Sequence, residues 1–176
     1  MARLTAPAAT AAFTAALLLA LVNCDASPTV PVERPFHGTT AGHLVSNGPA
    51  PAGRCPTDMP LYNTYHGSGE ATEMGAISVD GGECIFAVPG HPEQARSGAG
   101  LFTFAAANGD TITVAYDQTT GSYDPSSPWL LWSAPISLVA GTGRFKAARL
   151  VGVTWHGGMN RQTKETWSEF DGKIVY

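Results

Sequence analysis

Residues 101–116 read LFTFAAANGDTITVAY, a pattern that predicts a β-hairpin. Apolar side chains alternate with small or polar ones on both sides of a central turn: Phe102, Phe104, Ile112, Val114 and Tyr116. In the turn, Asn108-Gly109 supplies the positive φ angles that a tight hairpin requires. Each strand therefore has one apolar face, and we expect both faces to lie against the core.

Turn signals continue along the chain at intervals of about 8 to 12 residues, which is typical of an all-β sandwich or barrel. Only 14% of the 176 residues are charged, and the chain holds 20 Gly and 13 Pro, a usage that favours short strands over long helices. Glycines inside the expected strands favour a sheet curved into a barrel. The expected strands span about 36–45, 61–71, 74–80, 83–88, 101–106, 111–116, 129–139, 149–156 and 166–176. Long loops are expected at 46–60 and 117–128.

The charge pattern argues against nucleic acid as a partner. The formal net charge is −4, and no cluster of Lys and Arg is present to bind a phosphate backbone. The chain also lacks the GxSxG motif of serine hydrolases and the HExxH spacing of zinc enzymes. No metal site and no cofactor is expected.

The N-terminal segment has the features of an export signal. An uncharged run, AATAAFTAALLLALV, covers residues 8–22 and is followed by small and polar residues. Leu21-Val22-Asn23-Cys24 is similar to a lipoprotein signal, in which Cys24 would be lipidated and would attach the protein to a membrane; cleavage after Ala26 would instead release a free secreted protein. Residues 1–24 are therefore predicted to be a signal peptide or lipoprotein signal, 25–34 a flexible tether, and 35–176 the folded domain. Both alternatives place the protein outside the cytoplasm.

Two cysteines remain after the signal, Cys55 and Cys84. In an oxidising compartment, an even pair predicts a disulfide. Because Cys55 lies in an expected loop and Cys84 in an expected strand, the bond would hold the loop against the sheet.

Three segments carry a family resemblance. The run GEATEMG at 69–75, Ala107-Asn108-Gly109-Asp110 and the run AGTGRF at 140–145 resemble, in this chain order, segments of bacterial exported members of the allene oxide cyclase barrel-like family. The resemblance implies a single small antiparallel, calycin-like β-barrel of about eight strands, with an interior that holds an apolar ligand. Glu73 stands where the family has His, so the fold is carried over and the catalytic residues are not.

Candidate ligand-binding residues follow from strand alternation. His66 and Glu70 share one face of their strand; if that face is inward, Glu70 is a buried carboxyl and a candidate ligand anchor, and if it is outward, both are surface residues. Five aromatic residues are either core or pocket wall, since both use the same side chains: Phe102, Phe104, Tyr116, Trp132 and Trp155. Arg144 is expected to pair with a carboxylate at one end of the barrel, and Phe145 to fill the core.

These observations lead to three functional hypotheses. The first is an exported β-barrel that binds a small apolar molecule or serves an envelope role. The second is a cyclase or isomerase that folds an unsaturated substrate inside the barrel, with Tyr116 or Glu70 donating a hydrogen bond. The third is a secreted interaction module with a solid barrel and binding loops. The first two require an internal cavity of roughly a few hundred Å³, the usual range for ligand sites, and the third does not.

Overall fold

The computed structural model describes residues 30–88, 90, 94–124 and 126–176, and residues 31–176 form one compact unit. Nine antiparallel strands account for most of that unit: β1 (Glu33–Pro49), β2 (Leu61–Ala71), β3 (Gly75–Ala87), β4 (Gln94–Ala106), β5 (Thr111–Tyr123), β6 (Trp129–Pro135), β7 (Ser137–Gly141), β8 (Arg149–Asn160) and β9 (Glu165–Val175). A single turn of 3-10 helix, η1 (Gly143–Phe145), is the only helix among the described residues. The prediction of an all-β fold is confirmed.

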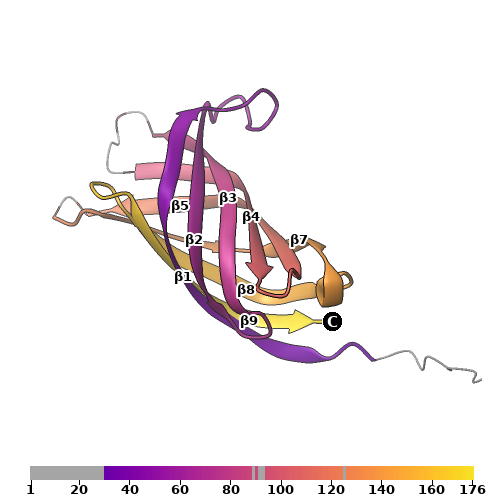
Figure 1. Cartoon of the computed structure of the whole chain (residues 1–176). Helices are drawn as coiled ribbons and strands as arrows, with labels where there is room; N and C mark the ends of the chain where they lie inside the picture. The colour runs from indigo at the N-terminus through magenta and orange to yellow at the C-terminus, as the bar shows by residue number, and fades with distance from the viewer. Residues whose placement is uncertain (1–29, 89, 91–93, 125) are drawn as a thin grey trace, which may run out of the picture. The chain divides into compact units, whose positions relative to one another are not determined.

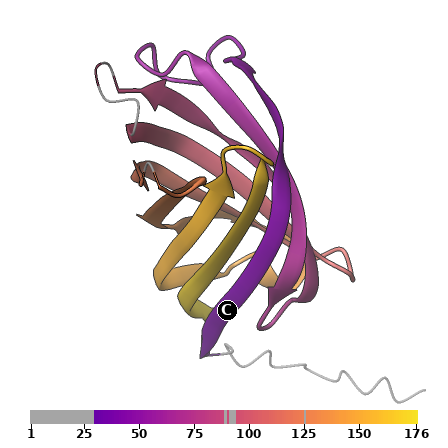
Figure 2. The ribbon, with the colours of Figure 1, turned by 90° about the vertical axis from the view of Figure 1, so that its left-hand side faces the viewer.

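The nine strands form one sheet in the order β4-β3-β2-β1-β9-β8-β6-β5-β7, and β4 also pairs with β5. The sheet therefore curls into a barrel-like shape, whose curvature is clear in two perpendicular views (Figures 1 and 2). The expected barrel is not fully closed. Only two register pairs, Ser122↔Leu131 and Tyr123↔Leu130, join β5 to β6, so the hydrogen-bond ladder is thin at this seam.

The hairpin of residues 101–116 is present, although its turn differs from the expected one. Gly109 has a positive φ of 88°, while Asn108 does not. Instead, the Asn108 side chain accepts a hydrogen bond of 3.0 Å from the backbone N–H of Asp110. An Asx turn of this kind holds the loop without a left-handed Asn.

Several strand boundaries differ from the prediction. The expected strands 74–80 and 83–88 are one continuous strand, β3, because Gly81 and Gly82 pair with both neighbouring strands instead of forming a turn. The expected strand 129–139 is two strands, β6 and β7, which separate at Pro135-Ile136. The ends of β1 and β5 also extend into the expected loops 46–60 and 117–128.

Large apolar side chains form one core cluster, against which the C-terminal residue Tyr176 packs. The fully buried ones include Phe36, Phe104, Ile112, Phe145 and Ile174. At the end of the sheet where Tyr176 lies, Arg144 pairs with Asp110, with 3.4 Å between Nε and Oδ2, and donates a hydrogen bond to the carbonyl of Glu73. Phe145 and Arg144 thus lie as expected, one in the core and one paired with a carboxylate.

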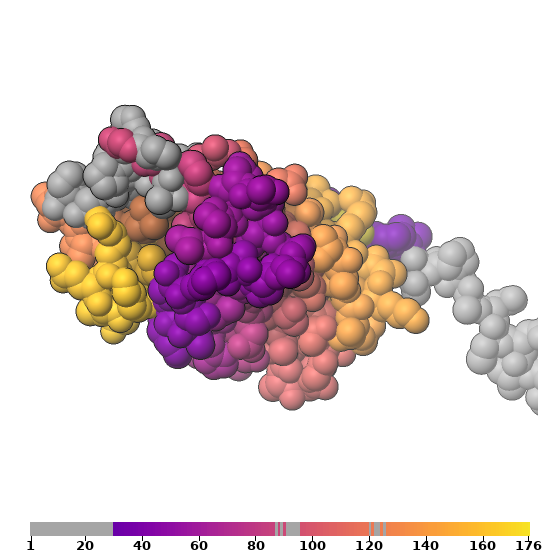
Figure 3. Space-filling model, turned by 90° about the horizontal axis from the view of Figure 1, so that it is seen from above, coloured from indigo at the N-terminus to yellow at the C-terminus, as the bar shows by residue number. Residues whose placement is uncertain are grey.

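The opposite end carries the connection between β1 and β2. Within this connection, Cys55 forms the predicted disulfide with Cys84 of β3, with Sγ atoms 2.06 Å apart. Viewed from this end, the indigo and purple atoms of β1, β2 and their connection form a prominent lobe (Figure 3). The loop is therefore held to the sheet directly beside position 83.

The predicted signal peptide and its candidate lipidation site, Cys24, lie outside the described residues, as do residues 25–29 of the expected tether. The first strand begins at Glu33, two positions before the expected start of the domain. Within the described part of the chain, no helix has the length and apolar character needed to cross a membrane.

Candidate functional site

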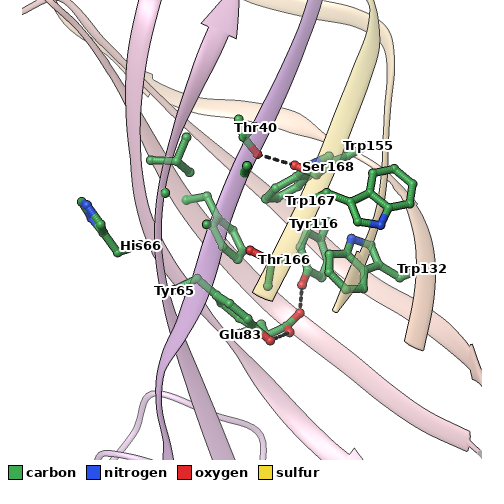
Figure 4. A pocket seen from close by; sticks show the side chains of 15 residues that line it. Thr40, Tyr65, His66, Glu83, Tyr116, Trp132, Trp155, Thr166, Trp167 and Ser168 are labelled. Atoms are coloured by element: carbon green, nitrogen blue, oxygen red, sulfur yellow. Dashed lines mark hydrogen bonds between the residues drawn. The ribbon is translucent and has the colours of Figure 1, made fainter. Parts of the chain in front are cut away.

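A narrow cavity lies inside the curved sheet, between the aromatic core and the end that carries the β1–β2 connection. The centres of water-sized molecules can occupy about 40 Å³ of it. On the same measure, about 10 to 15 Å³ is enough to hold one water molecule. Eight of the nine strands, all except β7, contribute residues to its wall, among them Thr40, Tyr65, Glu83, Phe102, Tyr116, Trp132, Trp155 and Ser168. Figure 4 shows these side chains converging from opposite walls.

The polar centre of the wall is Glu83, which receives hydrogen bonds from two tyrosines. Tyr65 donates to Oε1 at 2.5 Å, and Tyr116 donates to Oε2. Ser97, itself buried, is a further hydrogen-bond partner of Glu83 and of Tyr116. Both carboxylate oxygens are thus bound by protein hydroxyls (Figure 4).

A second layer of amides fixes the direction of these hydrogen bonds. Asn47 donates from Nδ2 to Oδ1 of Asn63, and Asn63 donates from Nδ2 to the Tyr65 hydroxyl at 2.8 Å. Since Tyr65 accepts from Asn63, its own hydrogen is free to point to Glu83. Every donor in this chain is oriented toward the carboxyl group, an arrangement that stabilises negative charge there.

An irregularity in the β3–β4 ladder positions this group. The register shifts between Gly82 and Cys84, where β4 has an extra residue and Ala99 adopts a left-handed φ of 48°. A bulge of this kind reverses which side chains face inward, so both Phe102 and Ser97 reach the interior. Gly100 then leaves room for Tyr116, because a Cβ at Gly100 would lie 2.3 Å from the tyrosine ring.

Burial dominates the electrostatics of the three groups. It raises the pKa of Glu83 above its ordinary value, although the hydrogen bonds from Tyr116, Tyr65 and Ser97 act in the opposite direction. The pKa values of Tyr65 and Tyr116 are both raised well above the ordinary range, first by burial and then by the nearby charge of Glu83. Both phenols therefore keep their protons at neutral pH.

Trp155 provides the second polar feature of the wall. It is 6% exposed, and its indole N–H is buried without a hydrogen-bond partner. Buried N–H groups are almost always paired, and an unpaired donor costs about 1 to 3 kcal/mol. Trp155 also lines the cavity, so this unpaired donor belongs to a side chain that a bound ligand would contact.

The five aromatic candidates occupy two kinds of position. Phe102, Tyr116, Trp132 and Trp155 line the cavity, whereas Phe104 is fully buried in the core beneath it. Trp132 lies over Gly157, where a Cβ would be 2.6 Å from the indole ring. Four of the five aromatic candidates are therefore pocket residues, and Phe104 is a core residue.

Glu70 and His66 lie on the outer face of β2, so the outward alternative is correct. Tyr65, Gly67, Gly69 and Ala71 alternate with them and occupy the inner face, and Glu70 is exposed. Glu70 lines a wider groove of about 840 Å³ on the outside of the sheet, together with His37, His156 and Asp171. The carboxyl group that lines the cavity, which the inward alternative would have made Glu70, is Glu83.

Neither Glu83 nor Tyr65 was identified from the sequence. A signal was available, since Ile77, Val79, Gly81 and Glu83 alternate on one face of a single strand. The expected turn at Gly81-Gly82 concealed this alternation. Among the described residues, no group of three His, Cys, Asp or Glu side chains is arranged to hold a metal ion.

Comparisons with known proteins provide little further information. No family model matches the sequence, and a search of the curated proteins finds no match. Among solved structures, the pterocarpan synthase dirigent protein GePTS1 is similar at 16% sequence identity and a TM-score of 0.46, covering 89% of this chain and 99% of that chain. Its similarity is too low to support a statement about function.

These findings correct the resemblance to the allene oxide cyclase barrel-like family. The solved structure found to be similar is a dirigent protein, which belongs to a distinct family of eight-stranded β-barrels. The three segments that carried the resemblance meet at one end of the sheet, where Arg144 contacts Asp110 and Glu73. Turns that close a curved sheet share such residues for reasons of backbone geometry, as the positive φ values of Glu73, Gly109 and Gly143 illustrate.

Proposed function

We propose that this protein is exported and binds a small, largely apolar molecule in the cavity beside Glu83. The uncharged run at residues 8–22 supports export. The cavity supports binding, because its wall combines aromatic side chains with a few convergent polar groups, as is usual in small-molecule sites.

The observation that carries the proposal is the unpaired indole N–H of Trp155. A ligand with an oxygen or nitrogen acceptor would supply the missing hydrogen bond, while its apolar part would contact Phe102 and Tyr116. The preformed partners of Glu83 support binding over catalysis, because Tyr116 already donates its hydrogen to the protein. At about 40 Å³ for the centres of water-sized molecules, the cavity is smaller than the roughly 300 Å³ at which ligand pockets usually begin, so it supports binding of a compact part of a ligand.

The test is native mass spectrometry of the mature protein purified from its own host, followed by solvent extraction of any bound molecule. We expect a reproducible adduct that is apolar and contains a hydrogen-bond acceptor. Trp155→Phe should lower the occupancy, because it keeps an aromatic ring and removes the N–H. Trp129→Phe is the matched control, since Trp129 lies on β6 outside the cavity wall.

The opposite result is equally informative. A protein without an adduct, whose tryptophan fluorescence also does not respond to benzyl alcohol, would contradict the proposal. Equal occupancy in Trp155→Phe and wild type would exclude the indole N–H as a ligand contact.

A further inference from the structure

We infer that the ligand presents a compact, positively charged group, of the ammonium type, to the carboxylate of Glu83. This inference rests on the proposed function and specifies the chemical class of the ligand. It follows from the charge, the aromatic walls and the size of the cavity.

The first step concerns charge. Glu83 is a partly buried carboxyl group in the cavity wall, and no Lys, Arg or His among the described residues forms an ion pair with it. The one basic residue of the wall, His66, has a side chain that is 53% exposed and pairs with Asp80 at 2.7 Å. In Figure 4 its ring points away from the other side chains. An isolated buried charge is costly, and a cation in the cavity would offset that cost.

The second step concerns hydrogen bonds. Because Tyr65 and Tyr116 already donate to the two oxygens of Glu83, a ligand need not donate to them. What the protein leaves uncompensated is the negative charge of Glu83. A quaternary ammonium, which has no N–H, is therefore as acceptable here as a protonated amine.

The third step concerns the aromatic wall. The rings of Phe102 and Tyr116 are nearly parallel, at 18°, and Trp155 stands at 88° to the first and 72° to the second. These three rings stand in two orientations and, together with Trp132, form an aromatic corner next to the carboxylate of Glu83. Aromatic rings attract cations through their electron-rich faces, and desolvated sites strengthen that attraction.

Size provides the last step. A cavity of about 40 Å³ for the centres of water-sized molecules admits a compact headgroup and not a bulky apolar body. The remainder of the ligand would extend out of the cavity, whose wall also contains the hydroxyl groups of Thr40 and Ser168, 2.7 Å apart. An acceptor two or three bonds from the charge would be available to Trp155.

The experiment compares two probes of equal shape on the mature protein by calorimetry: choline, and its uncharged carbon isostere 3,3-dimethylbutan-1-ol. Both carry a hydroxyl acceptor, and only choline carries charge. We expect choline to bind at least about tenfold more tightly to the wild type, an effect in the range of desolvated cation–π and charge interactions. The preference should persist in about 0.5 M salt, because a buried pair is weakly screened.

Variants then locate the effect. Glu83→Gln should reduce the preference to within about twofold by weakening choline binding alone. Glu70→Gln is the matched control, since it removes the same charge from the outer face and should leave the preference unchanged. The comparison of the two probes on the wild type requires no variant, so it remains decisive if Glu83→Gln fails to fold.

Three outcomes would overturn the inference. Equal binding of both probes to the wild type would show that the cavity binds neutral ligands, which leaves the proposed function standing. A preference that survives in Glu83→Gln, or disappears in Glu70→Gln, would place the charge effect elsewhere. If neither probe binds, the inference fails, and the proposed function fails with it for ligands of this size.

Discussion

The Tyr65 hydroxyl lies 2.5 Å from Oε1 of Glu83, although the two residues are not opposite each other in the β2–β3 ladder. Tyr65 is opposite Gly81, and Glu83 is opposite Asn63. The contact is therefore diagonal across the ladder. A buried carboxyl group held in this way should control how the stability of the protein responds to pH.

We predict that stability decreases as pH rises from mildly acidic to neutral. Burial raises the pKa of Glu83 in the folded state, so the folded protein keeps this proton when the unfolded chain has lost it. The stabilising contribution is fully present below the unfolded pKa and is lost as pH rises through the folded one. Denaturant unfolding of wild type and Glu83→Gln between about pH 4 and 8 should show this slope in the wild type only. The same slope in both proteins would assign it to another group.

Tyr116→Phe should destabilise the fold by about 1.5 to 3 kcal/mol, because it removes a hydrogen bond to a charged group and leaves one oxygen of Glu83 less well bound. It should also raise the pKa of Glu83 further, which shifts the pH-dependent loss of stability to higher pH. Thermal unfolding at several pH values measures both effects. Tyr62→Phe is a suitable control, since the Tyr62 hydroxyl contacts Arg54 and not Glu83. Equal effects of the two substitutions would contradict the assigned role.

Alkaline pH should destabilise the wild type through its two buried phenols. Because the pKa values of Tyr65 and Tyr116 are raised in the folded state, the unfolded chain loses these protons first. The unfolding free energy should therefore fall as pH rises above 10. Absorbance titration of tyrosine should show delayed ionisation, and the double variant Tyr65→Phe/Tyr116→Phe should lack the delayed component.

Gly100→Ala should disrupt the site, although it adds only one methyl group. The added Cβ would lie 2.3 Å from the Tyr116 ring, so the ring must move away from Glu83. Overpacking of this kind costs about 1 to 3 kcal/mol. Gly48→Ala, where no atom lies within 4 Å of the new Cβ, is the matched control for the same substitution in a strand. Near-UV circular dichroism reports the tyrosine environment, and an unchanged spectrum in Gly100→Ala would refute the prediction.

Reducing the disulfide should lower stability by about 3 to 4 kcal/mol in the chain-entropy account, since Cys55 and Cys84 are 29 positions apart. Cys84 is fully buried and adjacent to Glu83, so reduction should also weaken ligand binding at the cavity. Thermal unfolding with and without a reductant, together with peptide mapping of the free thiols, measures these effects. A Cys55→Ser/Cys84→Ser protein as stable as the wild type would contradict them.

The sequence predicted the strand content and the disulfide because those features depend on local alternation and on cysteine number. Phe102 and Tyr116 were placed on inward faces for the same reason. The position of Glu83 depends on two features that alternation does not reveal. One is the continuation of β3 through Gly81-Gly82, a pair that normally indicates a turn, and the other is the bulge at Ala99, which brings Ser97 inward.

The orientation of Glu70 shows a related limit. Alternation on β2 allowed either face to be the interior one, because the face that carries the glycines was as plausible an interior as the face that carries His66 and Glu70. Tertiary contacts decided between them. Gly67 and Gly69 lie where the backbone of β1 approaches so closely that a Cβ would meet it at 2.7 Å or less. Neighbouring strands, which the sequence of β2 does not specify, impose that requirement.

The thin seam between β5 and β6 has a consequence for motion. Between Ala115 and Ser122, no register pair in the described part of the chain joins β5 to β6 or β7. Side chains connect the strands there instead. The Thr119 hydroxyl, for example, donates to the carbonyl of Ser133 at 2.8 Å. Amides of β6 that face this seam should exchange with solvent faster than those of β2 or β3, which are paired on both sides. Because Trp132 belongs to β6, transient separation of β6 from β5 would widen the cavity without unfolding the remaining sheet.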